Sequence, residues 1–244
     1  MSFHISRWSA WAPGLSTLEA WSAWAANDAG LEGEESPKVP ELPAMVVRRA
    51  SRADRIALRA AFDCCADITG PLPTVFASRH GEVHRSLELL EALAKEEGLS
   101  PTSFSLSVHN AAAGLFSIGR KDRSPSTSLA AGLDSLPMAV LEAAGMLAEG
   151  APRVLVVAQE EPLPAPFQPY VAEREPCAAV ALLLEPATSG ASLSLELISG
   201  RSAGENTGLE HGYLLPFLRF LGRGQVGELE LLHGARGWRW RRTA

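Results

Sequence analysis

The sequence predicts an α/β fold in which a mixed, mostly parallel sheet is buried between helices. Short apolar segments that suit strands alternate with segments of about 12 to 15 residues that have helical periodicity. The segment RVLVVAQ at 153–159 is almost entirely apolar, as expected for a strand that is buried on both faces. The chain has 244 residues, of which 46% are hydrophobic, and this is enough for one sizeable core.

The expected strands are short runs of apolar or alternating residues, bounded by turn residues. In chain order they cover residues 1–13, 73–78, 126–131, 153–159, 178–186, 192–199 and 226–233. We expect the strands at 178–186 and 192–199 to be antiparallel neighbours. The tail GWRWRRTA alternates tryptophan with arginine, which favours an amphipathic edge strand whose arginines oppose aggregation. An alternative is that this basic tail attracts an acidic carrier protein or closes over a partner.

The expected helices begin at capping residues, and several end at glycine. They cover residues 17–26, 51–66, 83–97, 136–149 and 209–221, together with the second part of 104–118, whose first part is expected to be extended. Thr17 (or the serine before it) and Ser51 are the predicted caps of the first two helices. Residues 27–44 are acidic and rich in proline, so we expect a surface loop there. The whole chain is interpreted as a single domain, 1–244, in which residues 205–244 form a C-terminal extension.

The composition excludes several classes of function. The net charge of −6 argues against a nucleic-acid-binding protein. No apolar stretch reaches roughly 18 residues, so no membrane span is expected, and the N-terminus lacks the pattern of a signal peptide. The cysteines Cys64, Cys65 and Cys177 form an odd, sparse set, typical of reduced thiols in a protein of the cytoplasm. No cofactor is expected.

Residues 104–161 carry a characteristic order of motifs. V-H-N-A-A-A-G at 108–114 is followed by S-x-S-L-A-A at 126–131, by a helix that ends at Gly150, and by the strand R-V-L-V-V. This order resembles the N-terminal half of a β-ketoacyl synthase. The resemblance implies one half of a thiolase-like fold, with a mixed, mostly parallel five-stranded sheet and helices on both faces.

Two further motifs resemble a narrower group within this family. W-S-A-W-A-P-G at 8–14 and E-E-P-L-P at 160–164 are similar to segments of the half-length chain-length factors of aryl polyene biosynthesis. The resemblance covers about residues 1–200, and it includes the arginine-rich segment 44–61, which opens a helix.

The resemblance implies that Leu133 occupies the position of the family's nucleophilic cysteine. Counting back from Gly150 places that position in the segment G-L-D-S-L. A leucine cannot supply the thiolate that acyl transfer needs. The catalytic histidines of the family belong after about residue 250, and none of the six histidines here can take their roles. We therefore expect no catalytic residue and no enzymatic activity of the chain by itself.

The resemblance also implies a partner and a binding surface. The expected partner is a full-length β-ketoacyl synthase, bound as a heterodimer through 104–118 and through strand 126–131, which in the family pairs antiparallel across the two-fold axis. An acyl carrier protein is expected to contact the pair transiently. The residues implied for the tunnel end and the interface are Phe104, Val108, Asn110, Ala111, Ala112, Leu115 and Phe116. The predicted function is that of a non-catalytic chain-length factor in polyene, polyketide or fatty-acid-type biosynthesis.

Several alternatives remain open at this point. The chain could be a scaffold that stabilises the synthase without a role in chain length. It could also be a thioesterase or acyltransferase that uses Ser135, although G-L-D-S-L is not the G-x-S-x-G pattern of a nucleophile elbow. His80 and His84 share one helix face and could bind zinc, but a polar cluster at the start of a helix is the simpler interpretation. His109 is expected to be a hydrogen-bonded histidine of the interface or core.

Overall fold

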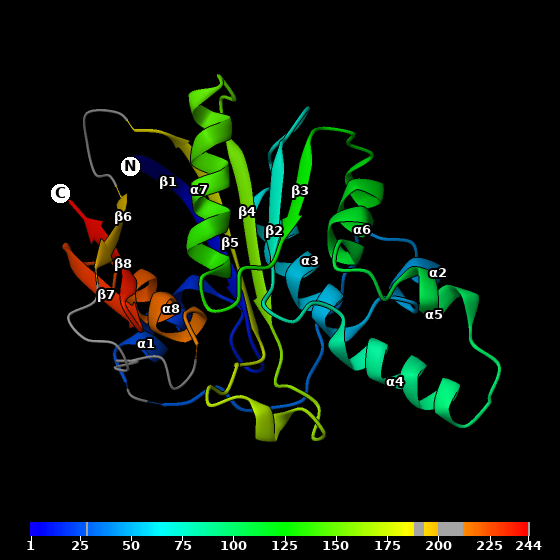
Figure 1. Cartoon of the computed structure of the whole chain (residues 1–244). Coiled ribbons are helices and arrows are strands. Elements are labelled where there is room, and N and C mark those ends of the chain that lie inside the picture. The colour runs from blue at the N-terminus through cyan, green and yellow to red at the C-terminus, as the bar shows by residue number, and fades with distance from the viewer. Residues whose placement is uncertain (28, 188–192, 200–211, 244) are drawn as a thin grey trace.

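The protein forms one mixed sheet with helices on both faces (Figure 1). The computed structural model describes residues 1–27, 29–187, 193–199 and 212–243. The strands are β1 (Ser2–Trp11), β2 (Thr74–Ala77), β3 (Ser126–Leu129), β4 (Val154–Glu160), β5 (Ala178–Pro186), β6 (Leu193–Ser199), β7 (Gly227–His233) and β8 (Arg236–Arg242). The helices are α1 (Leu18–Ala25), α2 (Ala44–Val47), α3 (Arg52–Cys64), α4 (Val83–Ala94), α5 (Pro101–Ser105), α6 (Ala111–Arg120), α7 (Ser135–Ala148) and α8 (Leu214–Arg223), with a 3₁₀ turn at Gln168–Tyr170. The predicted α/β class is confirmed.

The sheet has more strands than predicted and a different balance of directions. The order is β3-β2-β4-β5-β1-β6-β8-β7, so the described residues form eight strands and not five. The first five in this order form the expected half, and β6, β8 and β7 extend the sheet beyond β1. Only β2–β3 and β2–β4 are parallel, and the other five pairings are antiparallel. The prediction of a mostly parallel sheet was wrong because a continuous apolar run shows that a strand is buried, but not the direction of its neighbours.

The N-terminal strand explains a second difference. β5 and β6 are not neighbours, because β1 lies between them: Trp11 is opposite Ala179 of β5, and Phe3 is opposite Leu193 of β6. Nor is β8 an edge strand, since it lies between β6 and β7. Strands that are close in the sequence usually pair, but a distant strand can insert between them.

The first helices begin where their capping residues predict. The Thr17 hydroxyl accepts a hydrogen bond from the Ala20 N–H (3.2 Å). Ser51 and Asp54 form a capping box, in which each side chain accepts a hydrogen bond from the other residue's backbone N–H (2.9 and 3.0 Å). These caps satisfy backbone donors that the first turn of a helix leaves free.

The later helices differ from prediction in detail. Residues 104–110 are not extended, since α5 runs to Ser105 and α6 starts at Ala111. The helix predicted over 83–97 ends at Ala94, and the one predicted over 209–221 is α8. Residues 205–211, which begin the expected C-terminal extension, lie outside the described residues, as does residue 28 of the expected loop. Within the described ranges, no helix has the length and apolar character needed to cross a membrane.

Two hydrophobic cores lie on the two faces of the sheet. Helices α7, α8 and α1 cover one face, where Trp21, Phe217 and Trp240 are fully buried. Helices α3 and α6 cover the other face, where Ile56 and Phe116 are buried. Strands β6, β7 and β8 and helix α8, here called the C-terminal module, belong to the first core. The module therefore packs beside α7 and covers sheet surface that would otherwise be exposed.

Candidate functional site

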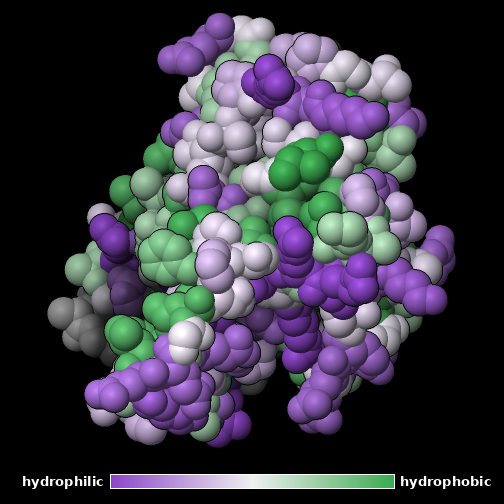
Figure 2. Space-filling model, turned by 90° about the vertical axis from the view of Figure 1, so that its right-hand side faces the viewer, coloured by the Kyte–Doolittle hydropathy of each residue, from purple (hydrophilic) through white to green (hydrophobic). Residues whose placement is uncertain are grey.

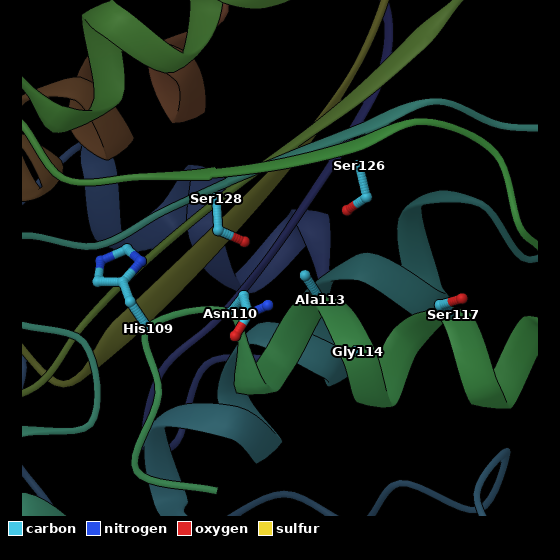
Figure 3. Close-up of a pocket in the computed structure, with 7 residues that line it drawn as sticks. All are labelled: His109, Asn110, Ala113, Gly114, Ser117, Ser126 and Ser128. Carbon is cyan, nitrogen blue, oxygen red and sulfur yellow. The ribbon is translucent and has the colours of Figure 1, made fainter. Parts of the chain in front are cut away.

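A groove lies between α6 and β3 at one edge of the sheet (Figure 3). β3 is the last strand on this side, and no described strand pairs with its outer backbone groups. The groove has a volume of about 520 Å³. Its lining consists of His109, Asn110, Ala113, Gly114, Ser117, Ser126 and Ser128. In Figure 3 the serines of β3 and the side chains of α6 face the same space.

The side chains that line the groove are mostly small or polar, and none of them is an aspartate, glutamate, lysine or arginine. A Cβ atom added at Gly114 would meet no atom within 4 Å, so the helix surface is open there. Ser126 already accepts a hydrogen bond from the Thr74 hydroxyl (2.8 Å). In the part of the chain that the structure describes, neither the Asn110 amide nor the Ser128 hydroxyl has a hydrogen-bond partner. Free polar groups beside an unpaired strand edge can bind the backbone of another polypeptide.

His109 closes one end of the groove and is hydrogen-bonded as predicted. Its Nε2 lies 2.9 Å from the carbonyl oxygen of Ser78. Gly81 has φ +54°, and a Cβ there would lie 2.8 Å from the imidazole Cδ2. A glycine at this turn therefore gives His109 the space it needs to reach the backbone.

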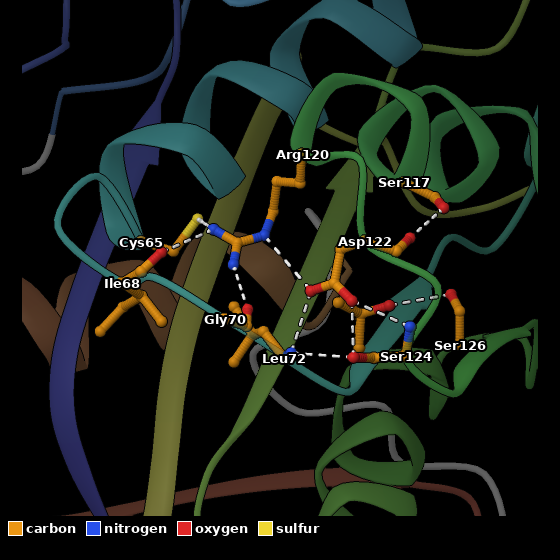
Figure 4. Close-up of polar contacts among 10 residues, drawn as sticks. Cys65, Ile68, Gly70, Leu72, Ser117, Arg120, Asp122, Ser124 and Ser126 are labelled. Atoms are coloured by element: carbon orange, nitrogen blue, oxygen red, sulfur yellow. Dashed lines mark hydrogen bonds and ion pairs between the residues drawn. The ribbon is translucent and has the colours of Figure 1, made fainter.

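Arg120 and Asp122 tie the other end of α6 to the sheet (Figure 4). The Arg120 guanidinium donates to two carbonyl oxygens of the segment 68–70, at 3.1 and 3.0 Å. The Asp122 carboxylate accepts from the N–H of Leu72 (3.0 Å) and from the hydroxyl of Ser124 (2.6 Å). Burial alone would raise the pKa of Asp122, but these hydrogen bonds outweigh it and hold the pKa below 3.8. This network holds the end of α6 against the segments that lead into β2 and β3.

The predicted tunnel and interface residues separate into two groups. Phe104 and Val108 are exposed (66% and 47%), and Asn110 lines the groove. The other predicted residues lie on the buried face of α6; they are Ala111, Ala112, Leu115 and Phe116. The ring centroids of Phe116 and Phe62 are 5.0 Å apart, so the Phe116 side chain points into the core of the chain.

Helical spacing accounts for this division. Residues 110, 113, 114 and 117 follow the i, i+3, i+4, i+7 pattern of one helix face and all line the groove. The predicted list lacked Ala113, Gly114, Ser117, Ser126 and Ser128. Extending the spacing from Asn110 along α6 would have found the first three, because the apolar positions between them mark the buried face.

Leu133 lies buried just before α7, beside a cavity of only about 10 Å³. The residues around this cavity are Gly132, Leu133, Ser135, Leu136, Ala158, Glu160, Glu175, Tyr213 and Leu214. They include no cysteine and no histidine. The three cysteines are buried elsewhere, and burial raises the pKa of Cys64 to about 12 and that of Cys177 to about 11.

The other candidate reactive groups have structural partners. The Ser135 hydroxyl donates to the Gly132 carbonyl (2.7 Å) and accepts from the Ala131 N–H (3.0 Å), so both of its hydrogen-bonding roles are used within a turn. His84 Nε2 lies 2.8 Å from the Pro162 carbonyl oxygen. Among the described residues, no group of three or more potential ligands comes together around a metal position. The geometry thus supports neither the serine enzyme nor the zinc site.

Two buried carboxyl groups line the Leu133 cavity. Glu160 accepts a hydrogen bond from the Arg79 backbone N–H (2.7 Å), and Glu175 forms an ion pair with the Arg79 guanidinium (3.0 Å). Burial, together with the negative charge of Glu175, raises the pKa of Glu160 well above its usual value. Three C-terminal arginines form ion pairs: Arg236 with Asp134 (2.7 Å), Arg239 with Glu230 (2.7 Å) and Arg241 with Glu228 (2.6 Å). The basic tail that one interpretation required is therefore largely neutralised within the chain.

A mixed sheet covered on both faces, with a groove at its edge strand and a buried Leu133 just before α7, is the arrangement expected for one half of a thiolase-like fold. The sequence pattern of the beta-ketoacyl synthase N-terminal domain matches residues 21–241. The chain therefore belongs to the β-ketoacyl synthase N-terminal domain family, and the resemblance drawn from the sequence is confirmed. A search of curated protein sequences finds no match.

Solved structures agree with this assignment. A ketosynthase (ApeO) in complex with its chain length factor (ApeC) from Xenorhabdus doucetiae is 31% identical, with a TM-score of 0.85, over 99% of this chain and 100% of the matched chain. The ishigamide ketosynthase/chain length factor is 18% identical, with a TM-score of 0.69, over 82% and 68%. The AntDE:AntF complex, a type II polyketide synthase acyl-carrier protein with its ketosynthase, is 12% identical, with a TM-score of 0.74, over 100% and 99%. The last two show the shared fold alone.

Proposed function

We propose that this chain is the non-catalytic partner of a full-length β-ketoacyl synthase and acts as its chain-length factor. The observation that carries the proposal is the open, uncharged edge of β3 beside the α6 groove. We combine it with the expectation, drawn from the family resemblance, that Leu133 occupies the nucleophile position. The similarity to a ketosynthase–chain length factor complex supports it.

In the proposed complex, a strand of the synthase pairs antiparallel with β3. The sheet of this chain then continues into the partner. The outer N–H groups of β3 donate hydrogen bonds to the partner strand, and the outer C=O groups accept them. The Asn110 amide and the Ser128 hydroxyl bind polar groups of the partner at the same time. Gly114 and Ala113 let the partner's backbone approach α6 closely, because they present almost no side chain.

Chain length is set, in this proposal, by Phe104 and Val108. Both side chains are exposed, and Val108 directly precedes His109 at the end of the groove; in this proposal the bound partner covers both. Their bulk limits the room for the growing acyl chain at the far end of the synthase tunnel, since a filled slot resists further packing by about 1–3 kcal/mol. Phe116 is enclosed in the core of this chain and does not take part.

The chemistry belongs to the partner. The synthase supplies the nucleophile and the groups that stabilise the decarboxylating unit, whereas the buried Leu133 contributes neither a thiolate nor a proton. The acyl carrier protein delivers substrates to the synthase and contacts this chain only transiently.

A scaffold without a role in chain length is the second candidate, because the polar lining of the groove suits a polypeptide better than an acyl chain. Reconstituting the pair with Phe104→Ala or Val108→Ala and analysing the products separates the two. A length determinant should yield longer products, while a pure scaffold should change only the yield. Val226→Ala is the matched control, since Val226 is as exposed as Phe104 (66%) but directly precedes β7, at the opposite edge of the sheet. Unchanged product lengths in both variants would remove the chain-length role.

A further inference from the structure

The space in front of Leu133 is closed by the C-terminal module. The cavity of about 10 Å³ is at most large enough for one water molecule. Tyr213 and Leu214, at the start of α8, form part of its wall, and only 4% and 3% of their surfaces are exposed. No acyl group fits while these two side chains are in place.

A hydrogen-bonded latch joins β8 to the residue next to Leu133. The Asp134 carboxylate accepts hydrogen bonds from the Trp238 indole Nε1 (3.0 Å) and from the Arg236 guanidinium (2.7 Å). Asp134 and Trp238 are both buried, so the hydrogen bond between them is shielded from water. Asp134 precedes α7 directly but does not cap the helix with its side chain. Its carboxylate serves the contact with β8 instead.

The residue before Tyr213, Gly212, lies very close to the Glu175 side chain. Gly212 has φ +62°, and a Cβ there would overlap the Glu175 carboxylate, with Oε1 at 2.8 Å. Only glycine combines this backbone conformation with this approach. The Tyr213 hydroxyl donates to the Leu231 carbonyl oxygen of β7 (2.9 Å), which anchors the ring to the module.

We infer that Tyr213 and Leu214 form an internal plug that denies acyl groups access to position 133. The Asp134–Trp238 latch and the Gly212–Glu175 contact keep the plug closed. The significance of position 133 rests on the proposed function. Two features then prevent acylation there: the side chain has no thiol, and the plug excludes the acyl group. A cysteine placed at 133 would be unreactive until the plug moves.

Alkylation of Leu133→Cys tests the plug directly. Iodoacetamide reacts when the thiolate sulfur attacks its methylene carbon and iodide leaves, so the rate reports access to the thiol. Leu141→Cys is the matched control, because position 141 lies on α7, which begins two residues after Leu133, and is 43% exposed. Peptide mass spectrometry assigns each product. We expect Cys at 133 to react roughly 100-fold more slowly than Cys at 141, because it reacts only after local opening. Comparable rates would overturn the inference.

Two further substitutions open the plug by different routes. Trp238→Phe keeps an aromatic side chain but removes the indole donor, and Gly212→Ala pushes the backbone away from Glu175. Each should raise the alkylation rate of Cys at 133 about tenfold or more while leaving Cys at 141 unchanged. The buried Cys64 should stay unreactive in the same samples, which excludes global unfolding as the cause.

If neither substitution changes the slow rate at position 133, Tyr213 and Leu214 are not the barrier and the inference is wrong. Alkylation requires no synthase, so this outcome is distinct from a failure of the proposed function, which is tested by product length.

Discussion

The two edges of the sheet are built in opposite ways. At one edge, β7 carries Glu228 and Glu230, whose carboxylates pair with Arg241 (2.6 Å) and Arg239 (2.7 Å) of β8. At the other edge, β3 reads Ser-Thr-Ser-Leu and carries no charge. Charged side chains on an edge strand oppose pairing with another sheet, whereas a short neutral edge permits it. The comparison indicates that one edge is protected and the other is open to a partner.

The surroundings of the two edges strengthen this difference. β3 lies beside the groove of about 520 Å³, and Figure 2 looks onto this side of the molecule, where apolar side chains are exposed among hydrophilic ones. β7 belongs to the C-terminal module, whose inner face is filled by Trp238 and Trp240. The module completes the first core and ends the sheet, while the β3 edge leaves polar groups free for binding.

The largest effect should follow from removing the support of the β3 edge. Phe116→Ala should lower the free energy of unfolding by about 3–5 kcal/mol, because it leaves a cavity between Phe62 and Phe76. Urea unfolding measures this change. Phe104→Ala is the matched control and should change stability by less than about 0.5 kcal/mol, since its side chain is 66% exposed. Equal effects of the two variants would contradict the assignment of inner and outer faces.

Filling the groove should weaken binding of the synthase. Gly114→Leu places a side chain where the isolated chain has open space, so folding should be unaffected, but the partner should be excluded at a cost of about 1–3 kcal/mol. This corresponds to roughly 5- to 150-fold weaker binding, measured by titration calorimetry or co-purification.

Gly145→Leu provides the control for that experiment. Gly145 is an exposed glycine on α7 that also has no atom within 4 Å of its Cβ position, and it does not line the groove. The Gly145→Leu variant should therefore bind the synthase as the wild type does. Normal binding by Gly114→Leu would show that the β3 edge is not the interface.

A smaller, pH-dependent effect is expected at the anchor of β3. The pKa of Asp122 is lower in the folded chain than the ordinary 3.8, so its ionised form stabilises the fold above that value. This contribution is lost as the pH falls through the lower, folded pKa. Asp122→Asn should therefore cost roughly 1–2 kcal/mol at pH about 6, and the difference from the wild type should shrink near pH about 3. A difference that stays constant between these pH values in urea unfolding would argue against an ionised anchor.

The smallest effect concerns the protected edge. Replacing Glu228 and Glu230 together by serine makes β7 resemble β3, and we expect weak, concentration-dependent self-association in sedimentation velocity. Glu196→Ser is the control, because Glu196 also pairs with Arg239 but lies on β6, inside the sheet. If the double variant stays monodisperse at all concentrations, charge is not what protects this edge.

Sequence reasoning predicted local features well. The caps Thr17 and Ser51 mark the starts of α1 and α3, and β5 has the bounds that its apolar run predicts. The family itself could be identified because its motifs occur in the expected order and spacing. Each of these features depends on residues that are close in the sequence, so the pattern contains the information.

The sequence alone determined the α/β class, the family and the neutral character of the strand at 126–129, because these follow from composition, periodicity and motif order. Only the tertiary structure decided that β1 separates β5 from β6, that Phe116 faces inward while Asn110 and Gly114 face the groove, and that Tyr213 closes the space before Leu133. The physical reason is that these contacts join residues far apart in the chain. Local patterns show which surfaces are apolar, but packing across the sheet selects which surfaces meet.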